Sequence, residues 1–313
     1  MHMENLHDQA TLSYELDRSN PAYPPCQWDN GRFGIQTWLE QTPWLHLKNT
    51  RYGLKEGVAK PIPGLWEDPL LSQIHKIDIA MFLTAERISY QNISALVSAA
   101  PDEQSQLFLA TQTLDEARHY EVFCRHLADF GVTPEQREGM MARVTTPAMQ
   151  KFYDLICEQV DKRNFLTAML SHNIILEGMA YPLYRYQRKY WSRLDPGLSQ
   201  IIEGAFADEV HHVTFGEAIM RQHARGGEQQ RNELRRLTAD FHKLMIEVFE
   251  GVINHYVGLY QEAANNYMEI MGDIEIFPGR TMVTLSEEDQ VRWLLREVQN
   301  EHSARLVRIG LEN

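Results

Sequence analysis

The chain has 313 residues, of which 43% are hydrophobic and 23% charged, and its formal net charge at pH 7 is −13. This composition is typical of a globular protein with a large core, and the acidic balance argues against nucleic acid or an anionic membrane as the main partner. No run of 18 apolar residues is present, and the start MHMENLHDQ lacks the apolar stretch of a secretory signal. We therefore expect a cytoplasmic protein with reduced cysteines.

The hydrophobic pattern changes near residue 69. Residues 1–68 are rich in proline, glycine and tryptophan, which predicts a loop-rich extension that packs on a helical core. Beyond them, apolar residues recur three and four positions apart. This pattern predicts long helices over 69–100, 103–130, 134–160, 162–191, 197–224 and 229–266. Residues 267–284 look irregular, and a last helix is predicted to start at Ser286, with Asp289 as the acidic member of a capping box.

Strand-like alternation is almost absent from the sequence. Breaks that contain glycine or proline, such as FGVTPEQ and LDPGLS, separate the predicted helices by short connections. Long helices joined in this way pack antiparallel. The sequence therefore predicts an all-α bundle, with residues 69–313 as the helical unit.

One five-residue phrase occurs twice, as DEARH at 115–119 and as DEVHH at 208–212. On a helix, residues at i and i+3 project from nearly the same face, so the side chains of Glu116 and His119 can bind one metal ion together. Glu209 with His212 can do the same. Chance supplies about two acid-x-x-His pairs in a chain of this composition. The chain has four, but the shared wider phrase makes these two stronger candidates for a metal site than an isolated pair.

Two further glutamates have the setting that a two-metal site needs. Glu86 is flanked at helical spacing by apolar residues, and Glu177 has a similar apolar stripe. Buried charges are expected to be paired or to bind metal. The four glutamates at 86, 116, 177 and 209 are separated by 30, 61 and 32 residues. This spacing fits two helix pairs, each carrying Glu and then Glu-x-x-His, around one two-metal centre.

On these residues the sequence resembles the ferritin-like di-iron carboxylate superfamily over residues 69–225, with its four-helix bundle and additional helices. Within it, the ribonucleotide reductase small-subunit-like oxidases and the bacterial di-iron monooxygenase hydroxylases are the most similar branches. The metal ligands that the resemblance implies are Glu86, Glu116, His119, Glu177, Glu209 and His212. It also implies that Asp115 orients His212. Asp208 would orient His119 in the same way.

The sequence departs from several patterns of this superfamily. Phe123 stands where radical-generating subunits have a tyrosine, so no tyrosyl radical is stored at that position. His172 and Ile88 replace the pair that forms a crosslink in ligand-binding oxidases. Ala205 stands where the aminobenzoate-type N-oxygenases have an additional histidine ligand, and His211 replaces a common arginine and is expected at the surface.

Tyr181 is the remaining candidate catalytic residue. It follows Glu177 by one helical turn, at the place where related oxygenases put a pocket residue beside the metals. The alternative is a core tyrosine with a satisfied hydroxyl. Pro182 follows it and predicts a distorted ligand helix, because proline removes a helix hydrogen bond.

The resemblance implies an O2-activating oxidase or monooxygenase that uses two iron ions, or one manganese and one iron, with O2 as co-substrate. We expect it to hydroxylate or N-oxygenate a small or carrier-bound metabolite, with an electron donor such as a ferredoxin or a reductase, and we expect a homodimer. The alternatives are a radical-supplying or electron-transfer subunit, a metal storage protein, and a structural bundle whose carboxylates pair with arginines. The sequence leaves the substrate open.

Overall fold

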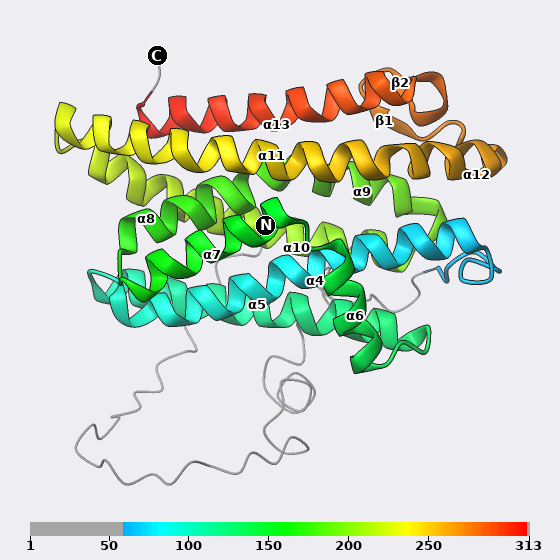
Figure 1. The fold of residues 1–313 in the computed structure, drawn as a ribbon, viewed down its shortest axis with the longest axis horizontal. Coiled ribbons are helices and arrows are strands. Elements are labelled where there is room, and N and C mark those ends of the chain that lie inside the picture. The colour runs from blue at the N-terminus through cyan, green and yellow to red at the C-terminus, as the bar shows by residue number, and fades with distance from the viewer. Residues whose placement is uncertain (1–58, 312–313) are drawn as a thin grey trace, which may run out of the picture.

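The computed structural model describes residues 59–311, and these residues form the predicted all-α bundle (Figure 1). Four helical segments make its centre. They are α4 (Pro69–Leu96), α5 (Glu103–Asp129), a π-helical segment (Leu170–Glu177) that continues into α9 (Gly178–Leu194), and α10 (Pro196–Ala224). Helix α4 packs mainly against α5, and α9 mainly against α10.

The other elements surround this centre. The long helix α11 (Glu228–Asn266) and the last helix α13 (Glu287–Ile309) both run along the upper side in Figure 1 and pack on α9 or on the π-helical segment. Helices α6 (Pro134–Val144) and α7 (Pro147–Asp161) lie in front and contact α4. The short elements are α8 (Phe165–Met169), α12 (Met268–Met271), two 3-10 turns (Val97–Ala99 and Met282–Thr284) and the antiparallel strands β1 (Glu275–Phe277) and β2 (Arg280–Thr281).

Two predicted helices differ from the structure. The single helix predicted over 134–160 is broken, because Pro147 starts α7 and Thr146 caps it by accepting a hydrogen bond from the Met149 amide. A residue before proline is disfavoured in the helical conformation, which explains the break. The helix predicted over 162–191 begins only after Arg163, which has φ of 54°. By contrast, the cap by Ser286 on the last helix is present as predicted.

The predicted extension over residues 1–68 lies mostly outside the described residues. Its described end is attached to the bundle by a hydrogen bond of 2.9 Å from the Ile62 amide to the Leu194 carbonyl at the end of α9. The division of the chain at residue 68 remains a prediction. Between residues 59 and 311, no helix is long and apolar enough to cross a membrane.

A fully buried aspartate joins three helices at one end of the bundle. Asp195 Oδ2 lies 2.8 Å from His75 Nε2 on α4 and 2.7 Å from His126 Nε2 on α5. Its other oxygen caps α10 by accepting from the Leu198 amide at 3.0 Å. Because Trp66 Nε1 donates to His75 Nδ1, the proton of a neutral His75 is on Nε2 and points at the aspartate. One carboxylate thus fixes the relative positions of α4, α5 and α10.

We expect Asp195→Ala to lower the free energy of unfolding by about 3 kcal/mol or more, because it leaves two buried imidazoles without an acceptor and removes a helix cap. Asp195→Asn keeps the cap and should cost less. Urea denaturation followed by circular dichroism measures both changes. An Asp195→Ala protein as stable as the original would show that this cluster does not stabilise the fold.

A second buried carboxylate, Asp78 on α4, is held by three neutral donors. Gln187 and Trp191 of α9 donate to it at 2.9 Å and 2.6 Å, and the Tyr260 hydroxyl of α11 is its third donor. Burial raises the pKa of Asp78 to about 6, although these hydrogen bonds act in the opposite direction.

This raised pKa predicts a pH dependence of stability. Asp78 binds a proton more tightly in the folded than in the unfolded chain, so its contribution to stability is fully present below about pH 4 and is lost as the pH rises through about 6. We expect the difference in unfolding free energy between the original protein and Asp78→Asn to change across this window. A difference that is constant from pH 4 to pH 7 would contradict the account.

Candidate metal centre

The structure brings the six predicted ligand side chains together in the middle of the bundle. They come from α4, α5, the last residue of the π-helical segment and α10, and each is at most 5% exposed. They form two overlapping groups whose ligand atoms lie within 4.8 Å of one another: Glu86, Glu116, His119 and Glu209, and Glu116, Glu177, Glu209 and His212. Glu116 and Glu209 belong to both groups and can therefore bridge two metal ions.

Both histidines turn the same ring nitrogen toward the carboxylates. His119 Nδ1 lies 3.3 Å from Glu86 Oε2 and 3.7 Å from Glu209 Oε1. His212 Nδ1 lies 3.2 Å from Glu116 Oε1 and 3.3 Å from Glu209 Oε2. The two Nδ1 atoms are thus placed to serve as metal ligands, one in each group.

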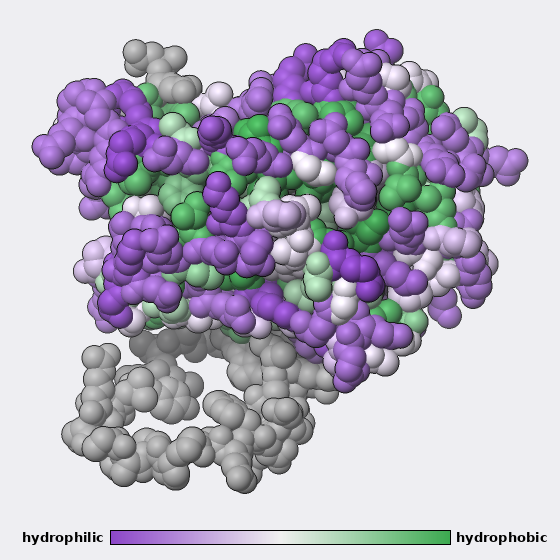
Figure 2. All heavy atoms as spheres, in the orientation of Figure 1, coloured by the Kyte–Doolittle hydropathy of each residue, from purple (hydrophilic) through white to green (hydrophobic). Residues whose placement is uncertain are grey.

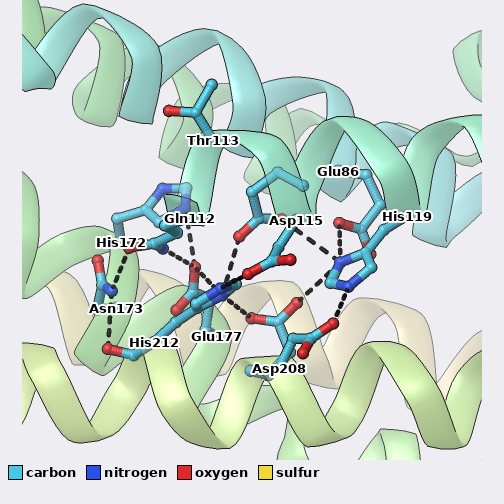
Figure 3. Close-up of polar contacts among 12 residues, drawn as sticks. Glu86, Gln112, Thr113, Asp115, His119, His172, Asn173, Glu177, Asp208 and His212 are labelled. Carbon is cyan, nitrogen blue, oxygen red and sulfur yellow. Dashed lines mark hydrogen bonds and ion pairs between the residues drawn. The ribbon is translucent and has the colours of Figure 1, made fainter. Parts of the chain in front are cut away.

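The opposite ring nitrogens face two aspartates, as Figure 3 shows. His119 Nε2 lies 2.9 Å from Asp208 Oδ2, and His212 Nε2 lies 3.4 Å from Asp115 Oδ2. Arg118 contacts Asp208 and also lies 3.3 Å from Asp115 Oδ1, so it ties the two aspartates together. An acceptor at Nε2 holds the ring proton there and leaves the lone pair of Nδ1 free for a metal. Each aspartate therefore sits where the resemblance places it.

The carboxylate cluster has more negative charge than the surrounding residues balance. Burial raises the pKa of Glu86 to about 8, and burial together with the charges of Glu116 and Glu177 raises the pKa of Glu209 well above its usual range. Buried oxygens of Glu86, Glu116 and Glu177 have no hydrogen-bond partner among the described residues. Two divalent cations would satisfy these oxygens and keep all the carboxylates ionised. Carboxylate oxygen with imidazole nitrogen is a donor set that suits iron and manganese, so these residues fit the implied metals.

Glu177 contacts Gln112 and His172, and the sequence had given neither residue a role at the metal centre. Gln112 Nε2 donates to its Oε1 at 2.9 Å, and His172 Nε2 lies 3.1 Å from the same oxygen (Figure 3). Asn173 donates to Gln112 Oε1 at 3.2 Å and to the His212 carbonyl at 3.0 Å. Gln112 donates to Oε1, and the buried Oε2 has no hydrogen-bond partner among the described residues, so Oε2 is the oxygen left for a metal.

The π-helical segment explains how His172 reaches Glu177. In an α-helix, residues five apart point about 140° away from each other. A π-helix closes its hydrogen bonds on the fifth residue, which brings such residues to neighbouring positions, and short π segments are common at functional sites. His172 is fully buried. Pro182 predicted a distorted helix, and the distortion is this π-helical segment, which ends at Glu177, five residues before the proline. It places the His172 side chain next to the candidate ligand Glu177.

An apolar cavity of about 110 Å³ adjoins the cluster. Glu86, Glu177 and Glu209 form part of its wall, and the rest is mainly hydrophobic side chains of α4, α7, α9 and α11. Tyr184 lines the cavity, with its hydroxyl 3.5 Å from Glu209 Oε1. Tyr181, the predicted pocket residue, is not part of this wall, and its hydroxyl donates to the Glu209 carbonyl at 3.2 Å.

Three positions at which the sequence departs from the family pattern, Phe123, Ala205 and His211, lie in the core or at the surface. Phe123 is fully buried and stacks on Phe82 with ring centroids 4.8 Å apart. Ala205 is buried, whereas His211 is exposed beside Phe108, away from both ligand groups.

The position of His172 predicts an effect on one metal only. We expect His172→Phe to weaken binding of the metal ion in the group that contains Glu177 about tenfold to a hundredfold, because residues that hold a metal ligand in place contribute to affinity on this scale. The first metal ion, in the group that contains Glu86, should bind as before. Anaerobic titration with Fe(II) gives both affinities, with His211→Phe on the exposed side as the matched control. Unchanged binding of both ions by His172→Phe would remove the role given to this residue.

Comparisons with known proteins place this geometry in a family. The family model described as "Ribonucleotide reductase, small chain" matches residues 73–275. No curated protein sequence matches the chain.

Solved structures of an R2-like ligand-binding oxidase have the same fold. A variant with an anaerobically reconstituted Mn/Fe cofactor gives a TM-score of 0.62 at 17% identity, over 92% of this chain and 100% of that chain. A second variant, with an aerobically reconstituted Mn/Fe cofactor, gives 0.61 at 16% identity, over 91% and 100%. The form described as a long soak, also with an aerobically reconstituted Mn/Fe cofactor, gives 0.57 at 18% identity, over 92% and 99%.

At these identities the structural likeness shows the fold, which is the ferritin-like bundle predicted from the repeated motif. The family match adds the relationship, because it spans more than half of the chain. The chain belongs to the ribonucleotide reductase small chain family.

Proposed function

We propose that this protein is a non-haem oxidase or oxygenase that holds two iron ions, or one manganese and one iron, and uses O2 to oxidise an apolar group of its substrate. The observation that carries the proposal is the pair of ligand groups that share Glu116 and Glu209 and open on an apolar cavity. Such a cavity gives O2 and an organic substrate access to the metals while excluding water.

When bound, the metals supply the electrons and the oxygen activation that protein side chains lack. The protein's contribution is to hold and orient them. The two bridging glutamates would fix the separation of the ions, and Asp115 and Asp208 would fix the histidine rings from the opposite side. Gln112 and His172 would hold one oxygen of Glu177, which would leave its other oxygen available to hold a metal.

The cavity supports an apolar reacting group. Its wall includes Met81, Phe82, Phe152, Leu176 and Phe249, and no lysine or arginine of the described part of the chain lines it. A charged group placed there would have only the metals as partners, and burial of an unpaired charge is costly. Hydroxylation of a hydrocarbon group or N-oxygenation of a neutral nitrogen in a small or carrier-bound metabolite fits this wall.

The main alternative in the same family is a radical-supplying or electron-transfer subunit of a larger complex. Phe123 speaks against it, because a phenylalanine cannot store the radical that a tyrosine stores at that position. The metal-lined cavity also favours a substrate of the protein's own. Oxygenation needs electrons from outside, so we further propose a ferredoxin or reductase as donor, together with a homodimer located in the cytoplasm.

Metal loading and reaction with O2 test the proposal. Protein loaded anaerobically with Fe(II), or with Mn(II) and Fe(II), should hold two metals per chain and develop a transient visible absorption when O2 is added. Glu86→Gln should reduce the metal content toward one per chain and abolish the absorption, because a carboxylate ligand is lost. Glu203→Gln, an exposed change on α10, is the matched control. The proposal fails if the original protein takes up no metal, or binds two metals without reacting with O2.

A further inference from the structure

A second hollow lies on the outer side of the metal-lined cavity. This groove is lined by Ser72, Gln73 and Lys76 of α4, by Arg143 of α6, and by His255 and Tyr256 of α11. Figure 2, in the orientation of Figure 1, shows hydrophobic side chains along α11 with hydrophilic side chains around them. Helices α4 and α11 line both hollows, whereas α6 lines the groove and α7, α9 and α10 line the inner cavity.

The helical register places the groove next to the inner cavity. On α4, Met81 lines the cavity and Ile77, one turn before it, lines the groove. On α11, Val252 lines the cavity and Tyr256, one turn after it, lines the groove. One turn advances about 5.4 Å, so the two hollows follow each other along the seam between α4 and α11. On α4, the cavity residue one turn after Ile77 is Met81, and a methionine side chain changes conformation easily.

The two hollows differ in charge. Among the described residues, the wall of the groove has Lys76, Arg143 and His255 and no acidic residue, whereas the wall of the inner cavity has acidic ligands and no lysine, arginine or histidine. Lys76 and Arg143 also line an adjoining hollow, together with Glu135. Within residues 59–311, neither Lys76 nor Arg143 forms an ion pair with an acidic side chain. Lys76 Nζ also lies 4.5 Å from the centroid of the Trp66 ring. In a chain with a net charge of −13, two such cations in a groove one helical turn from an apolar cavity form a local site for an anion.

The distance between the two ends sets the size of a ligand that would use both. Lys76 precedes Glu86 by ten residues on the same helix, which corresponds to about 15 Å along its axis. A molecule with an anionic group in the groove would therefore need an apolar part of about this length to reach the metals. A small polar metabolite would not span it.

We propose that the groove formed by Lys76, Arg143 and His255 binds the anionic head of an amphiphilic substrate, whose apolar chain runs along the α4 and α11 seam to the metal centre. This inference rests on the proposed function and adds the class and the direction of the substrate. The head lies outward and the reacting position lies far from it. The head can be a carboxylate or a phosphate, because lysine and arginine bind both.

Calorimetric titration of the full-length, metal-loaded protein under anaerobic conditions tests this orientation. The probes are dodecyl phosphate, dodecanoate and 1-dodecanol, each below the concentration at which it aggregates. At least one of the two anionic probes should bind about tenfold tighter than the alcohol, as expected for a charge-assisted hydrogen bond. Lys76→Gln with Arg143→Gln should abolish this preference and leave the affinity for 1-dodecanol unchanged. Lys243→Gln, an equal charge change at an exposed position of α11, should have no effect.

The two anions distinguish the sources of the head group. Tighter binding of dodecyl phosphate indicates a phosphate-bearing carrier, and tighter binding of dodecanoate indicates a free acid. The proposal is overturned if the alcohol binds as well as both anions, if the preference survives in the double variant, or if no probe binds.

A repeat with metal-free protein separates this orientation from the reverse one. If removing the metals abolishes the preference for an anion, the head lies on the metals and the proposal is wrong. Because binding is measured without turnover, and metal content is measured on the same samples, a failure of the proposed function would be recognised separately. Thermal unfolding of each variant confirms that the changes do not disturb the fold.

Discussion

The constraint on which the rest of the structure depends is the burial of four carboxylates in one small volume of a helical core. Their mutual repulsion and desolvation are costly, and two histidines with one nearby arginine do not balance the negative charge of four glutamates and two aspartates. The response of the chain is geometric, because four helical segments hold the carboxylate oxygens within reach of one another. A core of this kind is stable when cations occupy it, and this requirement links the fold to the chemistry.

The centre has two different sides. On the side of α5 and α10, the histidines are backed by Asp115, Asp208 and Arg118, which form a polar layer that fixes the rings. On the side of α4, α7 and α11, three of the glutamates face an apolar cavity. A carboxylate can change the way it binds a metal more easily than a histidine whose ring is fixed by an aspartate at Nε2. The arrangement therefore places the adaptable ligands where substrate and O2 would arrive.

Helical periodicity carried most of what could be predicted. Spacing alone indicated that Glu86 and Glu177 face inward and that the two Asp-Glu-x-x-His phrases lie on facing helices, because an α-helix repeats regularly. The same regularity explains the failures. No local sequence pattern predicts a π-helical segment, so the contact between His172 and Glu177 could not be predicted. Gln112 and Asn173 each lie one turn before a candidate ligand, a signal that was present but is common to many helices. Tyr184, rather than Tyr181, lines the cavity, because it lies two helical turns after Glu177 on the same face as Ala180 and Gln187.

The most direct test of the central claim is anomalous X-ray diffraction from crystals of the metal-loaded protein, recorded on both sides of the iron and manganese absorption edges. The account predicts two peaks per chain, one among Glu86, Glu116, His119 and Glu209 and the other among Glu116, Glu177, Glu209 and His212. A single peak, peaks elsewhere in the bundle, or a centre in which arginine or lysine side chains replace the metals would contradict it.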